Sequence, residues 1–506
     1  MIYTFEHFIK NPRLFTSPTQ LEVDICVVGS GAGGATAAAI AAARGARVVL
    51  LEAGSFLLPS DLTQREEDMY PKLFYEAGGR RTRNRAIRVM HGMGVGGSTI
   101  HNINLCKRTP KSIIESWQLT NLSSEKFHQI SGETETDLNV LKIEDKDFNE
   151  NNWLFKTGTE RLGYKGSALF HNRKGCAQSG FCELGCSFNA KMNALRVYIP
   201  KLVQHNGIVL SDTQALQLQW SGRRIHDLMA QVLHPISRSK ICDLTIKAKS
   251  YVLSAGALES VLLALRSRLP DPHRQVGRHL HLHPGVAVCG IFSHDVIMWK
   301  GIPQSYECTE FLSFDEREDK RLWLVGGSAH PTGVAGMLPG FGHEHAGLMK
   351  LYPKMASISA MLHDHTEGTV DADGPLLPKI DYDLGAEDRE QLARGLLESS
   401  KILFAAGAKK VYVPFRNLKE FTSAEQMRVD ELYPENMAID MVAVHPMSTM
   451  RMGTDQTSSV TDDFGRYHHL DNLWLADSSL FPTSLGVPPQ ISVYSIGRYV
   501  GGLLPI

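Results

Sequence analysis

Three glycines near the start of the chain have the spacing of a phosphate-binding loop. They are Gly29, Gly31 and Gly34 in VVGSGAGGATAAA, and they satisfy the pattern GxGxxG. In that pattern the first glycine permits a tight turn, the second lets the backbone approach a pyrophosphate, and the third allows close helix–strand packing. Glu52 follows where an acidic side chain can bind ribose hydroxyls, and it would repel a 2′-phosphate. The predicted chemistry is therefore the binding of a dinucleotide that lacks a 2′-phosphate.

The surrounding sequence predicts the elements that position these residues. The run VDICVVG (23–29) is short, apolar and β-branched, which is typical of a buried parallel strand. The alanine-rich stretch 35–43 is a strong helix former, and its N-terminus would offer free N–H groups and a positive dipole end to phosphates. A second strand, ARVVLLEAG, leads to Glu52. Together these features favour a dinucleotide-binding βαβ unit much more strongly than the glycines alone.

A second glycine cluster, RVMHGMGVGGSTIHN (88–102), also satisfies GxGxxG, but its context differs. It continues into STIHNINL, which is rich in β-branched and polar residues, and no alanine-rich helix follows. Because glycine has no Cβ, this cluster could instead let the backbone lie against a flat part of a ligand. NAD needs only one phosphate loop, whereas FAD carries a three-ring isoalloxazine far from its adenine. The pair of clusters therefore favours FAD.

The chain resembles the glucose–methanol–choline (GMC) oxidoreductases, a family of FAD-dependent enzymes that oxidise alcohols. The matching segments occur in the family's order and are the 29–34 loop with Glu52, GVGGSTIHN, VLSAGALESVLLA (252–264), VHPMSTMRMG (444–453) and NLWLADSSLFPTSLGVPPQ (472–490). Three further segments resemble the branch that contains long-chain alcohol oxidases and cholesterol-oxidase-like enzymes. They are GCAQSGFCELGCSFNAKMNALRVYIP (175–200), VGRHLHLHP (276–284) and PQSYECTEF (303–311).

The resemblance implies an α/β fold with a discontinuous, Rossmann-like FAD-binding domain and a second, α+β substrate domain built on an antiparallel sheet. Because distant motifs must meet on one ligand, the FAD-binding domain is assigned to residues 20–110, 200–285 and 440–506. The substrate-binding domain is assigned to residues 111–199 and 286–439. Inside it, the stretch 385–408 has apolar residues at helical spacing and ends in glycine, so it predicts a helix.

The resemblance assigns the alcohol chemistry to His445 in the VHPMST motif. Oxidation of an alcohol by a flavin removes a hydride from carbon, to flavin N5, and a proton from the hydroxyl. A base with a pKa near neutral, within hydrogen-bond reach of the hydroxyl, suits the second event. The family uses the histidine of this motif, so we expect His445 to be the catalytic base.

The family's second active-site position, a His or Asn before a proline in the last motif, is Pro488 in this chain. Proline has no side-chain donor or acceptor and no backbone N–H. The second hydrogen bond to the substrate oxygen is therefore either absent or made by another residue. The candidates are Gln490, Tyr306, Gln304, His281 and His283.

The same mapping predicts further residues close to the flavin, namely Gly97, Ser98, Asn102, Pro489 and Gln490. Asp477 maps to the family's acid near the ribityl chain and pyrophosphate. His101 occupies the position at which some members bond covalently to the flavin 8α carbon. Covalent attachment of FAD through His101 and a noncovalent ring contact both stay open.

Two patterns raise the question of a metal. Cys176, Cys182 and Cys186 are the only clustered thiols among eight cysteines, but no fourth cysteine lies near for a four-iron cluster, and buried thiols in a tight loop are favoured. The alternate histidines of HLHLH (279–283) share one face of a strand, yet they have no carboxylate or cysteine partner at metal spacing. We therefore predict no metal site, and leave an iron–sulfur centre as the alternative for the three cysteines.

Length and charge set the remaining limits. A chain of 506 residues predicts two or more domains. A net charge of −1 argues against charge-driven binding to nucleic acid, and the local basic run RRTRNRAIR (80–88) is predicted to be a solvated loop. The sequence shows neither a secretory signal core nor a run of about 18 apolar residues. A cytoplasmic protein without a transmembrane segment is expected, and an apolar substrate is compatible with peripheral membrane contact.

These observations predict FAD-dependent oxidation of the CH–OH group of a hydrophobic, long-chain or sterol-like alcohol, with oxygen or a quinone as electron acceptor. One alternative is a sugar or polyol dehydrogenase of the same family. The other is a GMC fold repurposed for non-oxidative flavin chemistry, because Pro488 replaces the second catalytic side chain.

Overall fold

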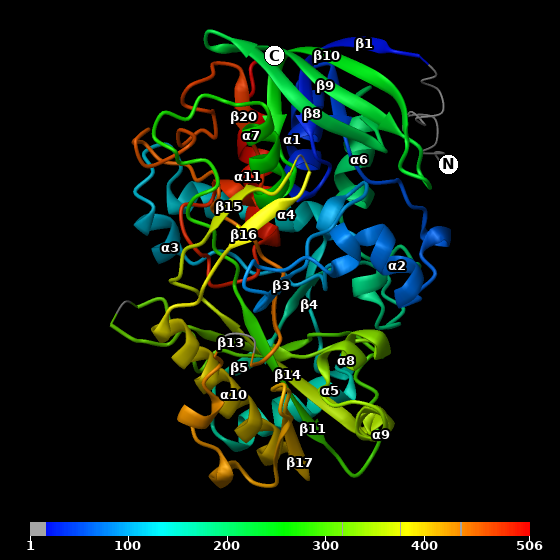
Figure 1. Cartoon of the computed structure of the whole chain (residues 1–506), viewed down its shortest axis with the longest axis vertical. Helices are drawn as coiled ribbons and strands as arrows, with labels where there is room; N and C mark the ends of the chain where they lie inside the picture. The colour runs from blue at the N-terminus through cyan, green and yellow to red at the C-terminus, as the bar shows by residue number, and fades with distance from the viewer. Residues whose placement is uncertain (1–16, 316, 375, 436–437) are drawn as a thin grey trace.

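The protein is described by a computed structural model, which covers residues 17–315, 317–374, 376–435 and 438–506. Two β-sheets lie one above the other along the long axis of the molecule, each with its own covering helices (Figure 1). The α/β fold predicted from the sequence is therefore confirmed. The domain boundaries given above remain a prediction.

The first sheet has the strand order β7-β2-β1-β10-β9-β8, and β20 pairs with β10. Its strands are β1 (Thr19–Val28), β2 (Val48–Leu51), β7 (Ile208–Leu210), β8 (Thr213–Ser221), β9 (Arg224–Leu233), β10 (Lys240–Leu253) and β20 (Leu473–Leu475). Strands β7, β2, β1, β10 and β20 are parallel, and β8 and β9 extend the sheet as antiparallel strands. The parallel strands are apolar and buried, β2 over its whole length and β1 from Val23 to Val28, as is typical of strands inside an α/β fold.

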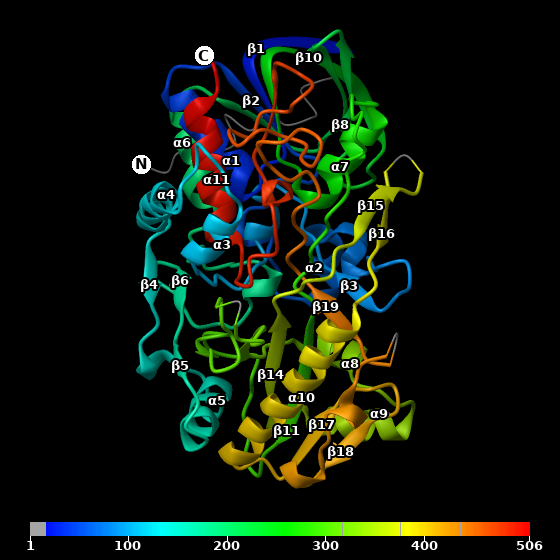
Figure 2. The ribbon, with the colours of Figure 1, turned by 90° about the vertical axis from the view of Figure 1, so that its left-hand side faces the viewer.

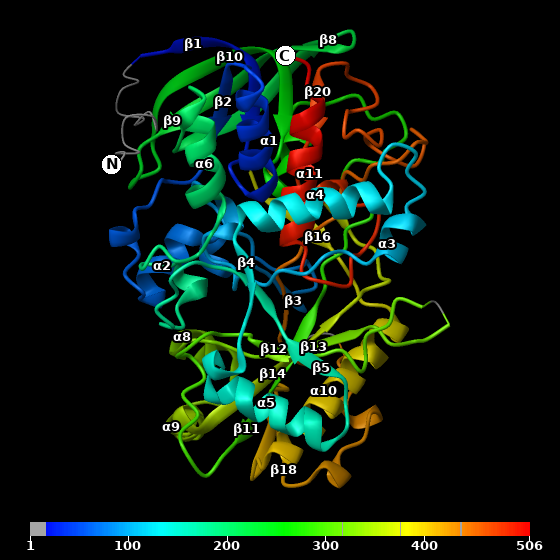
Figure 3. The same cartoon turned by 180° about the vertical axis from the view of Figure 1, so that it is seen from behind.

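Three helices lie side by side over one face of this sheet, as Figure 3 shows. They are α1 (Ala32–Ala43), α6 (Ala194–Gln204) and α11 (Gln490–Leu503). Small residues let α1 and α11 approach closely: a Cβ added to Gly497 would come within 2.3 Å of the Gly33 carbonyl oxygen. Helix α7 (Gly256–Arg266) packs on β8. The alanine-rich sequence of α1 therefore serves packing as well as helix formation.

The second sheet has the order β18-β17-β11-β14-β13-β12-β5, and its neighbouring strands are antiparallel. Its strands are β5 (Gly166–Ala168), β11 (Gly285–Ile291), β12 (Tyr306–Cys308), β13 (Leu322–Gly326), β14 (Met355–Leu362), β17 (Lys410–Val413) and β18 (Lys419–Phe421). Helices α5 (Glu150–Arg161) and α10 (Ala386–Ala406) pack together against it, as Figure 2 shows for α10. The helix predicted over 385–408 is confirmed as α10, and its C-cap is Gly407, with φ of 108°.

The remaining helices and strand pairs lie outside the two large sheets. The helices are α2 (Glu66–Leu73), α3 (Lys111–Ser116), α4 (Ser124–Asp137), α8 (Pro331–Met337) and α9 (His343–Lys350). The strands form two small pairs, β4 (Val140–Lys142) with β6 (Phe170–Asn172) and β15 (Thr369–Ala372) with β16 (Pro378–Asp381). Within the described residues, no helix combines the length and apolar character that crossing a membrane requires.

Two short strands bring distant segments together at the junction of the two halves. Strand β3 (Ile87–Val89) runs parallel to β19 (Met441–Ala443), and β19 also pairs with β11. The second glycine cluster follows β3 directly, His445 follows β19, and the HLHLH motif precedes β11. Because the three strands are neighbours, the three segments meet in space, and the candidate site lies where they meet.

Candidate active site

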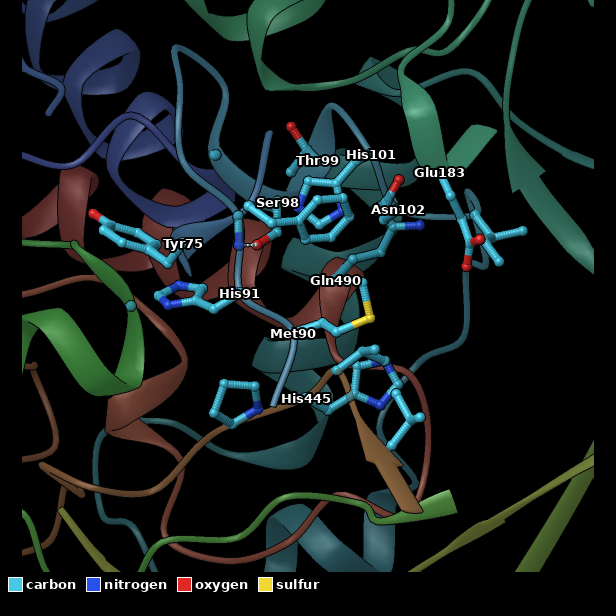
Figure 4. A pocket seen from close by; sticks show the side chains of 18 of the residues that line it. Tyr75, Met90, His91, Ser98, Thr99, His101, Asn102, Glu183, His445 and Gln490 are labelled. Atoms are coloured by element: carbon cyan, nitrogen blue, oxygen red, sulfur yellow. Dashed lines mark hydrogen bonds between the residues drawn. The ribbon is translucent and has the colours of Figure 1, made fainter. Parts of the chain in front are cut away.

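One large cavity of about 510 Å³ runs from the first glycine loop to the second sheet. Figure 4 shows Ser98, His101, Asn102, Gln490 and His445 around it. All of the site residues predicted from the sequence except Gly34 line this cavity.

The three glycines of the first loop have different surroundings. Gly29 has φ of 101°, and a Cβ added there would come within 2.2 Å of the Ser254 carbonyl oxygen. A Cβ on Gly34 would come within 2.0 Å of the Gly29 carbonyl oxygen. An added Cβ on Gly31 would meet no described heavy atom within 4 Å, and Gly31 is the N-cap of α1. Gly29 and Gly34 are therefore needed for packing, whereas Gly31 leaves open space in front of the N-terminus of α1.

Glu52 joins the two glycine clusters. Its carboxylate accepts hydrogen bonds from the Ser30 hydroxyl (2.7 Å), the Gly54 N–H (2.9 Å) and the Gly94 N–H (3.3 Å). The side chain is buried, and this burial raises its pKa in spite of the lowering effect of these donors. Glu52 therefore holds the two loops in register at this end of the cavity.

The second glycine cluster packs against the first. A Cβ added to Gly97, which has φ of 53°, would come within 2.8 Å of the Gly31 Cα. Gly94 and Gly96 also have positive φ, 111° and 106°. Gly92 faces its own loop, because a Cβ there would come within 2.1 Å of His101 Nε2. The sequence suggested that these glycines make room for a flat ligand; the structure shows that they first make room for backbone and for His101.

His101 and Asn102 follow the short turn Gly97–Thr99. The His101 ring lies 4.0 Å from the Phe74 ring centroid, and its buried Nε2 has no hydrogen-bond partner among the described residues. Burial lowers the pKa of His101 to about 3, so the ring is neutral. The Asn102 amide donates to Gln490 Oε1 (2.8 Å).

The C-terminal motif supplies another part of the wall. Asp477 accepts hydrogen bonds from the Gly256 N–H (2.9 Å) and the Ser260 hydroxyl (2.7 Å), both in the first turns of α7. Pro488 and Pro489 line the cavity just before α11 begins at Gln490. The Gln490 amide donates to Asn172 Oδ1 (3.2 Å), so this side chain is held from two sides.

His445 lies in the cavity wall where the two halves meet. It is half-buried, and burial lowers its pKa to about 4, so its imidazole is neutral near pH 7. Its Nδ1 lies 3.3 Å from Nδ1 of His283, a residue that is 1% exposed.

The five candidates for the missing second side chain are separated by their positions. His283, Gln304 and Gln490 line the cavity. Tyr306 is instead packed among Phe148 and Phe155, and His281 lies 3.6 Å from the buried carboxylate of Asp364. Of the five, His283 is the one in hydrogen-bond contact with His445.

Sequence reasoning missed an ionic cluster on the cavity wall. The Glu259 carboxylate lies 2.6 Å from Arg80 Nη1 and 2.6 Å from His91 Nδ1. Burial alone would raise the pKa of Glu259, but His91 and Arg80 lower it to about 2. Arg80 belongs to the basic run predicted to be solvated, and that prediction is wrong for this residue, whose side chain is 3% exposed. The partner of Arg80, Glu259, is far away in the sequence, so the residues around Arg80 could not indicate this ion pair.

Sequence reasoning also missed Glu183 and Lys191. The Lys191 ammonium is buried and donates to the carbonyl oxygens of Ile100 (2.8 Å), Asn102 and Cys182 (2.9 Å). Burial lowers the pKa of Lys191 to about 8. Glu183 lines the cavity, and burial raises its pKa to about 7 although Lys191 acts in the opposite direction. Its carboxylate has no hydrogen-bond or ion-pair partner among the described residues.

Cys176, Cys182 and Cys186 line a second, small cavity beside Lys191. All three are free thiols, and burial raises the pKa of Cys182 to about 11. Among the residues that the structure describes, no three His, Cys, Asp or Glu side chains are grouped so that they could hold a metal ion.

Comparison with known proteins shows which family and which solved structures this chain is similar to. Two family models described as GMC oxidoreductase match residues 70–285 and residues 365–497, and together they cover more than half of the chain. An uncharacterised GMC-type oxidoreductase of Mycobacterium tuberculosis is 28% identical over 493 residues, covering 96% of this chain and 76% of the relative. The long-chain-alcohol oxidase FAO4A of Arabidopsis thaliana is 26% identical, covering 95% of this chain and 68% of the relative.

Solved structures share the fold. Pyridoxine 4-oxidase from Mesorbium loti matches with a TM-score of 0.71 and 18% identity, covering 95% of this chain and 98% of that chain. Formate oxidase from Aspergillus oryzae RIB40 matches with a TM-score of 0.71 and 16% identity, covering 96% of this chain and 98% of that chain.

Proposed function

The chain belongs to the GMC oxidoreductase family, and from this premise we propose that it oxidises the CH–OH group of an apolar, long-chain or sterol-like alcohol with FAD as its cofactor. The observation that carries the substrate class is the apolar lining of the cavity on the side of the second sheet and α8. Its apolar members include Val286, Ala287, Val325, Val334, Met337, Leu338 and Met361, and Ser357 and Ser359 lie among them. Apolar surface of this kind favours a hydrocarbon chain or ring system over a sugar.

The residues at the other end of the cavity fit FAD. Open space lies in front of Gly31, where the first turn of α1 has no side-chain cap, so its N–H groups are available to a pyrophosphate. Asp477 and Glu52 line the same end of the cavity, and they are proposed to accept hydrogen bonds from the ribityl and ribose hydroxyls of such a ligand. FAD bound there supplies the acceptor for the hydride that leaves the substrate carbon.

His101 is the residue proposed to contact the flavin ring, either noncovalently or through a covalent bond. Its Nε2 is buried on the cavity wall without a partner, which is costly for a polar atom unless a ligand completes the site. Gly97, Ser98, Asn102, Pro489 and Gln490 are proposed to line the same part of the site.

His445 is proposed to hold the hydroxyl of the substrate. It lines the cavity where the two halves of the molecule meet, and it is neutral near pH 7. A neutral imidazole can accept the hydroxyl proton or donate a hydrogen bond to the oxygen, according to which nitrogen carries its hydrogen.

A second substrate class is favoured by one observation. The Glu183 carboxylate lines the cavity without a partner, and such a group would bind a further hydroxyl or an ammonium group on the substrate. A polyol or an amino alcohol is therefore the second candidate.

Anaerobic reduction of the bound flavin tests the proposal. We expect fatty alcohols or sterols to bleach the flavin absorbance more effectively than short alkanols, sugars or amino alcohols. Bleaching by sugars or amino alcohols alone would favour the second candidate, and no bleaching by any alcohol would overturn the proposed oxidation. Admitting air, or adding a quinone, to the reduced protein then identifies the electron acceptor.

A further inference from the structure

His283 and His445 are cross-strand neighbours. The chain before β11 and the chain after β19 run antiparallel, and His281 forms a bridge with Met447 through two backbone hydrogen bonds of 3.1 and 3.0 Å. Moving two residues along both segments brings His283 opposite His445. The two imidazoles meet there, with their ring centroids 5.4 Å apart.

The backbone of the last motif determines which nitrogen of His283 is protonated. The Gly486 N–H donates to His283 Nε2 over 3.0 Å. A backbone N–H can only donate, so Nε2 must offer its lone pair. His283 is 1% exposed and burial lowers its pKa well below the usual value, so the ring is neutral. Its single ring hydrogen therefore sits on Nδ1.

The hydrogen on His283 Nδ1 determines the tautomer of His445 in turn. The two Nδ1 atoms are 3.3 Å apart, so His283 donates and His445 Nδ1 accepts. The opposite arrangement would need a hydrogen on His283 Nε2, which would then point at the hydrogen of the Gly486 N–H. Neutral His445 must therefore carry its hydrogen on Nε2.

We infer that His283 is a positioning residue that holds His445 in the tautomer with hydrogen on Nε2, so that His445 meets the substrate oxygen as a hydrogen-bond donor. This inference rests on the proposed function and revises the role of base that the sequence predicted for His445. A donor at this point stabilises the negative charge that develops on the substrate oxygen as its proton leaves to a base other than His445, for which the unpartnered Glu183 carboxylate on the cavity wall is the candidate. His445 is thereby held by the side chain of His283 and, through it, by the backbone N–H of Gly486, two residues before Pro488.

The surroundings of His283 keep it in place. The Asp364 carboxylate accepts hydrogen bonds from the backbone N–H groups of Leu282 (2.8 Å) and His283 (3.3 Å) and from the Ser484 hydroxyl (2.6 Å). Of the titratable neighbours, Asp364 favours the charged form of His283, whereas His281, His363 and His445 disfavour it. His283 also has φ of 51°, a conformation that is uncommon for a residue other than glycine and that is concentrated at functional sites.

Nitrogen NMR of the holoenzyme, labelled with ¹⁵N-histidine, tests the tautomer directly. The His445 signals are assigned by their loss in His445→Gln. We expect an unprotonated Nδ1 and a protonated Nε2 in His445 near pH 7. A protonated Nδ1 with a free Nε2, the form a base requires, would overturn the inference. This readout does not depend on turnover, so a failure of the proposed alcohol oxidation is told apart from a failure of the inference.

Two substitutions at His283 test whether its Nδ1 hydrogen sets the tautomer of His445 or whether its side chain only fills space. In His283→Asn the amide nitrogen takes the place of Nδ1 and still donates to His445, whereas in His283→Gln the amide oxygen takes the place of Nε2 and only accepts from Gly486. We expect His445 to keep its Nε2 hydrogen in the Asn variant and to show a mixture of tautomers in the Gln variant. The same His445 tautomer in both variants would contradict the inference.

Substitution of His445 provides a kinetic test. The amide of Gln can place an N–H donor near the position of Nε2 but cannot act as a base near neutral pH, whereas Ala does neither. We expect His445→Gln to retain at least tenfold more kcat than His445→Ala with an alcohol that reduces the wild-type flavin. Equal loss in the two variants would show that donation is not what His445 contributes.

Discussion

Gly97 and Gly31 lie so close together that a Cβ added to Gly97 would come within 2.8 Å of the Gly31 Cα. This contact explains why a chain with one phosphate-type loop has a second glycine cluster later in its sequence. The second cluster packs against the first, and Glu52 accepts hydrogen bonds from both loops. A ligand that binds at Gly31 therefore depends on the conformation of residues 92–97.

Substitution of Gly97 by Ala should weaken cofactor binding. The φ of 53° costs an L-residue about 1–2 kcal/mol, and the clash with Gly31 adds a similar amount, so we expect a loss of about 2–4 kcal/mol in stability. We also expect at least tenfold weaker FAD retention, measured as flavin per protein after dialysis. Gly222→Ala is the matched control, because Gly222 has φ of 57° but open space around its Cβ position. Equal flavin loss in the two variants would rule out the loop contact as the cause.

The parts of the site that were predictable from sequence are those set by local order. The strand–loop–helix unit around Gly29 and Gly31 follows from apolar, glycine-rich and alanine-rich runs in succession, and α10 follows from helical spacing that ends in glycine. In these segments each residue's neighbours in sequence are also its main neighbours in the fold.

What could not be predicted depends on contacts between distant segments. The partner of the second glycine cluster is the first loop, and the partner of Arg80 is Glu259 on α7. The HLHLH motif showed that alternate histidines share a face, but not that His283 would lie opposite His445, because that register is set by the bridge between His281 and Met447. A one-residue slip would have turned the imidazole to the other side.

The stability of the folded protein should depend on pH through the titration of Glu183. Burial raises the pKa of this carboxyl from its usual 4.5 to about 7. Between these values the folded state binds more protons than the unfolded state, so the stability contributed by Glu183 is lost as the pH rises from about 4.5 to about 7 and is constant outside that window.

Glu183→Gln removes this titration. We expect the Gln variant to gain about 1–3 kcal/mol over the wild type between pH 5 and pH 8, because each pKa unit corresponds to about 1.4 kcal/mol. Thermal or urea unfolding of both holoproteins at the two pH values measures the difference. Glu344→Gln on the exposed face of α9 serves as the control. Its difference in unfolding free energy from the wild type should be the same at both pH values. A Glu183 variant that behaves like this control would mean that the carboxyl titrates normally.

The attachment of the flavin can be decided at His101. If the unpartnered Nε2 is bonded to the flavin, acid precipitation of the wild type leaves the yellow colour in the pellet, and His101→Ala releases it to the supernatant. Whichever form the wild type takes, we expect flavin binding by the variant that is reduced but measurable. Colour in the wild-type supernatant would leave His101 as a noncovalent contact of the ring, and it would not affect the assignment of FAD itself.

The small side chains of β11 should make room in the cavity for the hydrocarbon chain of a long substrate. Ala287 pairs with Ser359 of β14, and both side chains line the apolar half of the cavity. Ala287→Phe would fill that space with a ring, so we expect kcat/KM to fall at least tenfold for long-chain alcohols and by less than threefold for short ones. Ala287→Ser is the control of similar size and should change the preference little. Because His445 lies at the junction with the flavin end, a substitution on β11 should act on the part of the substrate away from the hydroxyl. An equal loss for short and long alcohols would place the reacting group, instead of the hydrocarbon chain, beside Ala287.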